Sequence, residues 1–256
     1  MAIVRYLAMT AGEMASSVSL PPRAAWMACH FSPYGTGLAN LPQRLAPESL
    51  LILNDRTPIC DHDPVLIAAQ LEDCAERLGC SGVLLDLQRP GQPQTRELVS
   101  CLCRMVSVPI AVSECYAGEV PCPVFLPPPP PDEPLETYLE SWKGREIWLE
   151  AATDGLEIQL REAGAAAAPL SCWEVPETGG FADEGLHCHY QCRMQEDCAV
   201  FTLWRTRADL DGLLAEAEGL GVTTAVGLYQ EFYQKICHCE PVRRLVWQSV
   251  LRISRF

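Results

Sequence analysis

The stretch Gly82-Val83-Leu84-Leu85-Asp86-Leu87-Gln88-Arg89-Pro90 is the most informative part of this sequence. Its apolar run is typical of a parallel strand buried on both faces, with polar side chains only where the strand leaves the sheet. Asp86 and Gln88 are two residues apart, so they lie on one face of the strand. In closed parallel barrels the carboxyl ends of the strands carry the chemistry. The stretch therefore predicts where a functional site lies.

Short apolar runs and helical patterns alternate on both sides of this strand. Asp63, Pro64 and Gly79 are a predicted N-cap, first residue and stop of a helix over 64–78. Eight strands are predicted, over 3–9, 24–31, 50–53, 82–88, 108–115, 124–126, 146–151 and 222–229, with further helices over 95–105, 135–142, 209–218 and 241–253. We expect a single α/β domain over 1–256, a (β/α)8 TIM-like barrel in which some helices are shortened or missing.

The segment that follows the predicted seventh strand has a different period. The runs 156–161, 187–192 and 199–204 alternate between apolar and polar residues and are separated by turn residues, which indicates antiparallel hairpins. We therefore expect a small β-rich insertion over 153–205. The proline run Pro127–Pro131 cannot be helix interior or central strand, and we interpret it as a rigid loop between folded elements.

Charge and composition argue against two classes of partner. The 256 residues include 33 acidic and 19 basic ones, a formal net charge of −14, which disfavours nucleic acid and anionic membranes. No run approaches the roughly 20 apolar residues that a membrane span needs, and no signal peptide is recognisable at the start. Fourteen cysteines without an export signal indicate a reducing compartment, so we expect a cytoplasmic protein.

These features together resemble the family-18 glycoside hydrolases, the chitinase-like barrels. The stretch 79–90 resembles the family's fourth strand, which carries a D-x-x-D-x-D-x-E motif and continues into an aromatic-proline pair. The insertion lies where many members carry one, and the unit from Phe201 to Tyr229, with the turn Gly219–Val222, resembles the closing part of the barrel. The resemblance covers about two thirds of the chain and implies a carbohydrate ligand and no cofactor.

The chain departs from the family's motif at its last position. Leu84, Asp86 and Gln88 match the motif's last three acidic positions. The resemblance implies that Asp86 orients the substrate's acetamido group, which acts as the nucleophile, while the final Glu is the general acid. Gln88 has no titratable proton near pH 7, and the loss of general-acid catalysis costs on the order of 10²–10⁴ in rate. We expect a barrel that binds a glycan and cleaves it only where another carboxylate has taken over.

Several residues near the predicted strand ends are candidates for that role or for binding. Glu114, at the end of the predicted fifth strand, is the best substitute acid, with Asp86 as its partner carboxylate; the alternative is a rim residue paired with an Arg such as Arg89. The predicted substrate-binding residues are Gln88, Asp55, Tyr116, Glu150, Tyr229, Glu231, His30 and Tyr34.

Two alternatives from other classes remain open. Asp55, Asp61, His62 and Asp63 surround one loop and give a possible metal-dependent hydrolase, although Asp63 is better explained as a helix cap. The other alternative is a structural or interaction protein whose mouth is filled by its own loops. The clusters His187-Cys188-His189 and Cys237-His238-Cys239 invite a zinc site, but alternate residues of a strand point to opposite faces. We expect no metal.

Overall fold

A computed structural model describes residues 2–57, 62–89, 93–153, 155–162, 164–171, 174–176, 179–195 and 198–233. Eight parallel strands close into a barrel, because β1 pairs with β14 on one side and with β2 on the other. In sheet order they are β1 (Val4–Met9), β14 (Val222–Leu228), β8 (Ile147–Ala151), β7 (Val124–Leu126), β6 (Ile110–Ser113), β5 (Gly82–Asp86), β4 (Leu50–Asn54) and β2 (Ala24–Phe31). The short β3 (Leu38–Ala39) pairs antiparallel with β2.

The interior of the barrel is a packed apolar core to which every parallel strand contributes. Its buried members are Tyr6, Ala8, Ala25, Met27, Leu50, Ile52, Leu84, Ala111, Phe125, Trp148 and Val226. Because side chains alternate along a strand, Asp86 lies on the same interior face as Leu84, and Glu150 on the same face as Trp148. The core therefore forms a floor, and these two carboxylates lie above it at the carboxyl ends of their strands.

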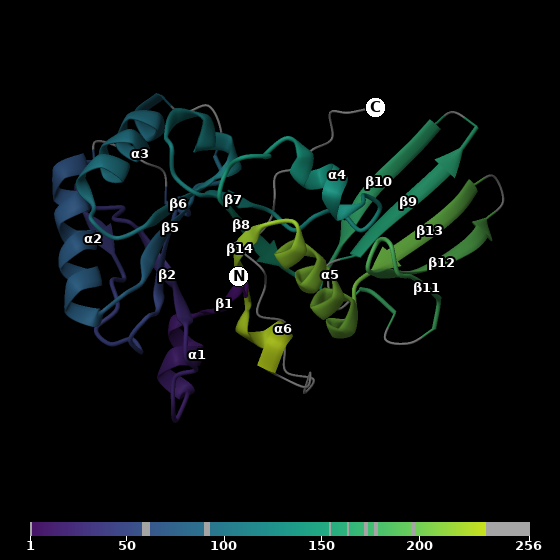
Figure 1. Cartoon of the computed structure of the whole chain (residues 1–256), viewed down its shortest axis with the longest axis horizontal. Helices are drawn as coiled ribbons and strands as arrows, with labels where there is room; N and C mark the ends of the chain where they lie inside the picture. Colours follow the sequence, from purple (N-terminus) through teal and green to yellow (C-terminus); the bar gives the residue numbers. More distant parts are fainter. Residues whose placement is uncertain are drawn as a thin grey trace.

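Helices cover the outside of the barrel in two groups (Figure 1). The helices α2 (Pro64–Leu78) and α3 (Pro93–Met105), with the 3-10 helix η1 (Glu114–Glu119), enclose an outer core against β2, β4, β5 and β6. The helices α4 (Leu135–Glu140) and α5 (Arg207–Gly219) enclose a second outer core against β7, β8 and β14. Two short helices, α1 (Ala11–Ser16) and α6 (Tyr229–Tyr233), follow β1 and β14.

The segment of the chain between β8 and α5 forms a separate antiparallel sheet, which projects away from α2 and α3 (Figure 1). Its strands are β9 (Gly155–Arg161), β10 (Gly164–Leu170), β11 (Phe181–Asp183), β12 (Cys188–Gln195) and β13 (Cys198–Trp204), in the order β10-β9-β13-β12-β11. Two histidines fasten it to α5: His187 hydrogen-bonds to Glu216 at 2.6 Å, and His189 to Asp209 at 2.8 Å.

The proline run between β7 and α4 is held by this sheet. The buried guanidinium of Arg205, just after β13, donates to the carbonyls of Pro129 at 2.5 Å and Pro130 at 3.2 Å. The Cys188 thiol donates to the carbonyl of Pro131 at 3.4 Å. Burial lowers the pKa of Arg205 to about 10, so the guanidinium stays charged near neutral pH. The run has no backbone N–H groups of its own, so its carbonyls accept from other segments; that of Pro130 also accepts from the backbone N–H of Glu133 at 3.3 Å.

The predicted barrel and its β-rich insertion are confirmed, with corrections at several ends. The fifth strand stops at Ser113 rather than Cys115, because the chain turns into η1. The last strand stops at Leu228, and Tyr229 opens α6. The predicted helix over 241–253 and the cluster around His238 lie outside the described residues. Within the described part of the chain, no helix combines the length and apolarity needed to cross a bilayer.

Candidate functional site at the barrel mouth

Two polar side chains lie next to each other where β4 and β5 end. Asn54 and Asp86 are directly paired in the register of the two strands. The Asn54 amide donates to the carbonyls of Met27 at 3.1 Å and Cys29 at 3.0 Å, where β2 departs from regular pairing with β4. Asn54 therefore satisfies backbone groups at an irregularity in β2 and fixes the strand ends that frame Asp86.

Asp86 is a fully buried carboxyl group held by its neighbour. Its Oδ1 accepts a hydrogen bond from Gln88 Nε2 at 2.5 Å. Its Oδ2 is buried and has no hydrogen-bond partner among the described residues. Burial raises the pKa of Asp86 to about 7; the hydrogen bond from Gln88 lowers it and the nearby charge of Asp55 raises it. The group is therefore poised to change protonation near neutral pH, which is common at functional sites.

The loop after β4 adds a second buried carboxylate. Asp55 is only 6% exposed, and its Oδ2 accepts from the backbone N–H of Arg89 at 2.8 Å. The guanidinium of Arg89 instead donates to the carbonyl of Arg56 at 3.3 Å, in an exposed position. The backbone bond ties the loops after β4 and β5 together. It also places Asp55 near enough to act on Asp86.

Glu114 is the first residue of η1 and is half-buried. The adjacent Cys115 thiol donates to the carbonyl of Leu87 at 3.1 Å, so η1 lies against the end of β5. Burial raises the pKa of Cys115 to about 12, helped by the charges of Glu114, Asp55 and Asp86. Glu114, its neighbour in the chain, Asp55 and Asp86 are thus the acidic residues whose charges act on this thiol.

Tyr116 takes a different position from the one expected of a ligand-binding aromatic residue. It is fully buried in the outer core beneath η1, and its hydroxyl donates to the carbonyl of Arg89. The reason is the turn at Ser113: in the helical geometry of η1, Tyr116 points back under the helix. Tyr116 thus supports the loop after β5 from behind.

Two predicted residues lie on the opposite side of the mouth. Glu150, near the end of β8, is buried at 6% exposure on the interior face. Glu231, in α6, accepts from the backbone N–H of Thr153 at 3.1 Å. Burial raises the pKa of Glu231 to about 7, while the hydrogen bonds from Thr153 lower it. Tyr229 packs against the small core of α1 and the first two strands rather than standing out as a wall.

The two residues predicted after β2 separate in the structure. His30 hydrogen-bonds through its ring to the Phe31 carbonyl at 2.8 Å and to the Asn40 amide at 3.0 Å, so it organises the loop beyond β2. Tyr34 is 97% exposed and does not lie with the buried carboxylates Asp86 and Asp55.

The residues of the possible metal-binding loop, Asp61 to Asp63, do not form a metal site in the described structure. Asp63 caps α2 as predicted, accepting from the backbone N–H groups of Val65 and Leu66. The His62 ring packs edge-on against Phe31 at 5.1 Å between centroids, and Asp61 lies outside the described residues. Where the chain is described, no three His, Cys, Asp or Glu side chains gather in a metal-binding arrangement.

Sequence reasoning missed the residues that position the strand ends. Asn54 lies just beyond the predicted strand over 50–53, and neither it nor Ser113 is among the predicted site residues. The Ser113 hydroxyl accepts from the Leu87 N–H at 2.9 Å and donates to the Leu85 carbonyl at 2.9 Å. The available signal was their place at strand ends beside Asp86, since small polar residues there commonly satisfy backbone groups.

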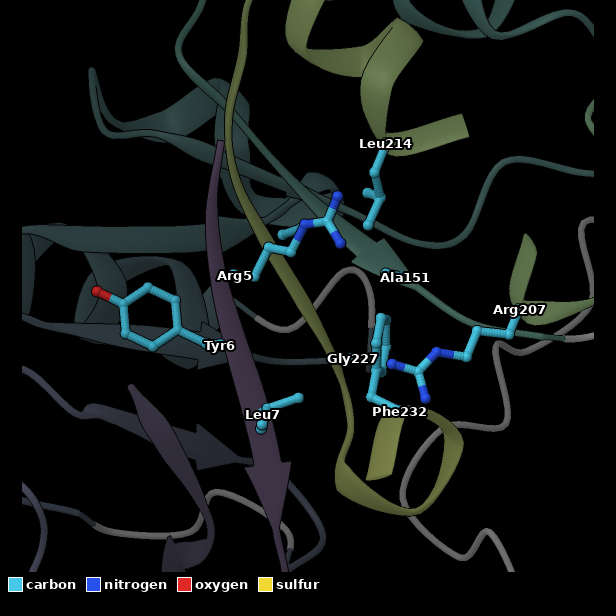
Figure 2. A pocket seen from close by; sticks show the side chains of 9 residues that line it. Arg5, Tyr6, Leu7, Ala151, Arg207, Leu214, Gly227 and Phe232 are labelled. Atoms are coloured by element: carbon cyan, nitrogen blue, oxygen red, sulfur yellow. The ribbon is translucent and has the colours of Figure 1, made fainter. Parts of the chain in front are cut away.

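A cavity of about 180 Å³ lies elsewhere, on the outer wall of the barrel (Figure 2). It is lined from β1, β8, β14, α5 and α6, with Phe232 packed over Gly227. Arg5 at its edge forms an ion pair with Asp211 at 2.8 Å. Since Arg5 and Tyr6 alternate along β1 and Tyr6 belongs to the interior core, this cavity is separated from Asp86 by the barrel wall.

Comparisons with known proteins identify the fold. No protein-family model and no curated protein matches the chain. A chitinase from Chromobacterium violaceum superposes with a TM-score of 0.53 at 11% identity, over 90% of this chain and 95% of that one. The spore cortex-lytic enzyme SleL of Bacillus cereus gives 0.51 at 11% identity, over 88% and 70%. The putative sporulation-specific glycosylase YdhD of Bacillus subtilis gives 0.52 at 10% identity, over 78% and 88%.

At such low identities these likenesses show a shared architecture only. The chemistry of the site is argued from the residues of this chain. The likenesses agree with the closed parallel barrel. The chain therefore has the closed α/β barrel fold of these three structures.

Proposed function

We propose that this protein is a divergent member of the chitinase-like, family-18 type of barrel, and that it binds a glycan at the mouth around Asp86. The observation that carries the proposal is the geometry of Asp86. It is a fully buried carboxyl group at a strand end, with one oxygen held by Gln88 and the other without a hydrogen-bond partner among the described residues. Sugar hydroxyl and amide groups are donors of the kind that such an acceptor binds.

Binding is favoured over efficient hydrolysis because of Gln88. Its amide donates to Asp86, as a protonated acid would, but it cannot release a proton to a leaving group. Glu114 is the carboxylate that we assign to a residual reaction, because it begins η1 directly after β6, the strand next to β5. In that reaction Glu114 is the proton donor and Asp86 the partner carboxylate.

The test is a screen of β-1,4-linked oligosaccharides for binding and for new reducing ends, with wild type beside Asp86→Ala and Glu114→Gln. We expect binding by the wild type and by Glu114→Gln, and its loss in Asp86→Ala. Residual hydrolysis is expected to disappear in Glu114→Gln. Failure of every oligosaccharide to bind a folded wild type would refute the proposal in favour of an interaction protein. Hydrolysis that is unchanged in Glu114→Gln would remove Glu114 from the reaction.

A further inference from the structure

One face of the antiparallel sheet carries no charged side chain in three successive rows. In the register of the strands, the first row is Ala165, Leu160, Ala199 and Met194. The second row, two residues along each strand, is Ala167, Ile158, Phe201 and Cys192. The third row is Pro169, Leu156, Leu203, Tyr190 and Phe181. We call these three rows the apolar face; residues between them point to the opposite face of the sheet.

The apolar face is open to solvent in the described part of the chain. Met194 is 78% exposed, Phe181 68% and Leu160 43%. No side chain of this face belongs to a hydrophobic core formed by the described residues. The sheet projects from the barrel beside α4 and α5 (Figure 1), and the proline run bounds this face at its barrel end, where Cys188 contacts the carbonyl of Pro131. A contiguous exposed apolar surface is typical of a protein interface.

The charge of the chain favours a partner that docks without using charge. The opposite face of the sheet holds charged groups, among them the ion pair of Arg193 with Glu157 at 3.1 Å. The chain has a formal net charge of −14, so two copies repel each other over most of their surface. The apolar face has no charge to add to this repulsion, and the cores of interfaces are depleted of charged residues. A second copy can therefore meet the first one here.

The sizes of the side chains make the apolar face complementary to itself. The edge strand β10 contributes the small side chains of Ala165 and Ala167, whereas β12 and β11 contribute the large ones of Met194 and Phe181. A two-fold axis along the central strand β13 places β10 and β9 of one copy over β11 and β12 of the other. Small side chains then lie beside large ones, and Leu160 of one copy lies opposite Met194 of the other.

The area of the apolar face is sufficient for a reversible pair. Strands about 4.8 Å apart, with about 3.4 Å per residue, give a flat face of roughly 500 Å² in each copy. A pair therefore covers roughly 1,000 Å², about the least that a specific interface needs. We propose that the protein forms a two-fold dimer in which the apolar faces of two copies pack on each other, about 10 Å apart as in a sandwich of two sheets. The proposal does not depend on glycan binding.

The test is sedimentation velocity of the full chain over about 1–200 µM. For wild type we expect a monomer–dimer equilibrium with a dissociation constant in the micromolar range, as suits a small interface. The dimer should become tighter as salt is raised, because salt screens the repulsion between two acidic chains. Met194→Glu places a charge inside the pair and should weaken it at least about 10-fold. Gln191→Glu, on the opposite face of the same strand, is the matched control and should leave dimerisation unchanged.

A double variant tests how the two copies are arranged. Leu160→Lys combined with Met194→Glu in one chain places opposite charges across the two-fold axis, so it should restore dimerisation. Both side chains are exposed, so these variants are expected to fold, which far-UV circular dichroism checks. A double variant as weak as Met194→Glu alone would overturn the two-fold arrangement about β13.

Other outcomes would overturn the dimer itself. These are a wild type that stays monomeric at every concentration, and a dimer that Gln191→Glu weakens as much as Met194→Glu does. A monomer that binds neutral phosphatidylcholine vesicles, and loses this binding in Met194→Glu, would assign the apolar face to a membrane surface instead.

Discussion

Gln88 Nε2 donates to Asp86 Oδ1 at 2.5 Å, two residues along the same strand end. The contact fixes the orientation of a fully buried carboxyl group with a neutral amide. Burial raises the pKa of Asp86 most, the hydrogen bond from Gln88 lowers it, and the charge of Asp55 raises it. The Gln88 amide itself does not titrate. The pair therefore combines a rigid acceptor with a partner that cannot act as an acid.

The first prediction concerns the charge of Asp86 and the stability of the fold. The pKa of Asp86 rises from 3.8 to about 7 on folding, so the folded state binds more protons between these values. Stability from this group is complete below pH 4 and falls as the pH rises toward 7. Asp86→Asn should therefore stabilise the protein above pH 7, by up to about 4 kcal/mol at roughly 1.4 kcal/mol per pKa unit.

The measurement is the free energy of unfolding in denaturant, for wild type and Asp86→Asn, across this pH range. Glu231, whose pKa is also raised to about 7, contributes to both proteins and cancels in the difference. Among the described residues, Asp55 acts on the pKa of Asp86, and Asp86 acts on that of Cys115; Asp55 and Cys115 are common to both proteins. A stability difference that is the same at low and neutral pH would contradict the prediction.

The second prediction concerns Gln88→Glu. A carboxylic acid at this position, next to Asp86, can donate a proton to a leaving oxygen, which the amide cannot. We expect hydrolysis of a bound oligosaccharide to rise by about 10²–10⁴ over wild type, measured as new reducing ends. Gln88→Asn, which restores no acid, serves as control. Equal turnover by wild type and Gln88→Glu would mean that position 88 is not the place of the acid.

The third prediction distinguishes two possible roles of Asp63, helix cap and metal ligand. Its carboxylate accepts from two backbone N–H groups at the start of α2. Asp63→Ala should lower the free energy of unfolding by about 1 kcal/mol, as loss of an N-cap does. The loss should be the same with a chelator or with added zinc or magnesium. Asp73→Ala on the same helix is the control and should change stability by less than about 0.5 kcal/mol. A loss seen only with metal would support the metal-dependent alternative.

The fourth prediction concerns the attachment of the antiparallel sheet. Arg205→Met removes the donors to the carbonyls of Pro129 and Pro130 in a buried place. We expect the free energy of unfolding to fall by about 2–4 kcal/mol. Arg193→Met removes an exposed partner of Glu157 on the same sheet and should cost under about 1 kcal/mol. Equal losses in the two variants would show that Arg205 does not anchor the proline run.

The barrel could be predicted because its strands are short apolar runs whose period differs from that of the helices between them. Asp86 could be placed for the same reason: two-residue periodicity puts it on the face of Leu84. Periodicity carries no such information where a strand ends. The turn at Ser113 into η1 changed the direction of Tyr116, and the turn at Leu228 into α6 changed that of Tyr229.

Contacts between distant segments could not be predicted from the sequence either. The pairing of His187 and His189 with α5 depends on how the insertion lies against the barrel, which alternation within a strand does not specify. Arg205 likewise reaches carbonyls more than seventy residues earlier in the chain. Such long-range polar contacts depend on tertiary packing, so a local pattern could not predict them.

Hydrogen–deuterium exchange with and without a β-1,4-linked oligosaccharide shows whether the ligand lies at the carboxyl ends of the barrel strands. We expect slower exchange in the segments that follow β4, β5 and β8, around Asp55, Leu87 and Thr153. Slower exchange confined to the antiparallel sheet, or to the outer cavity between Arg5 and Phe232, would contradict it.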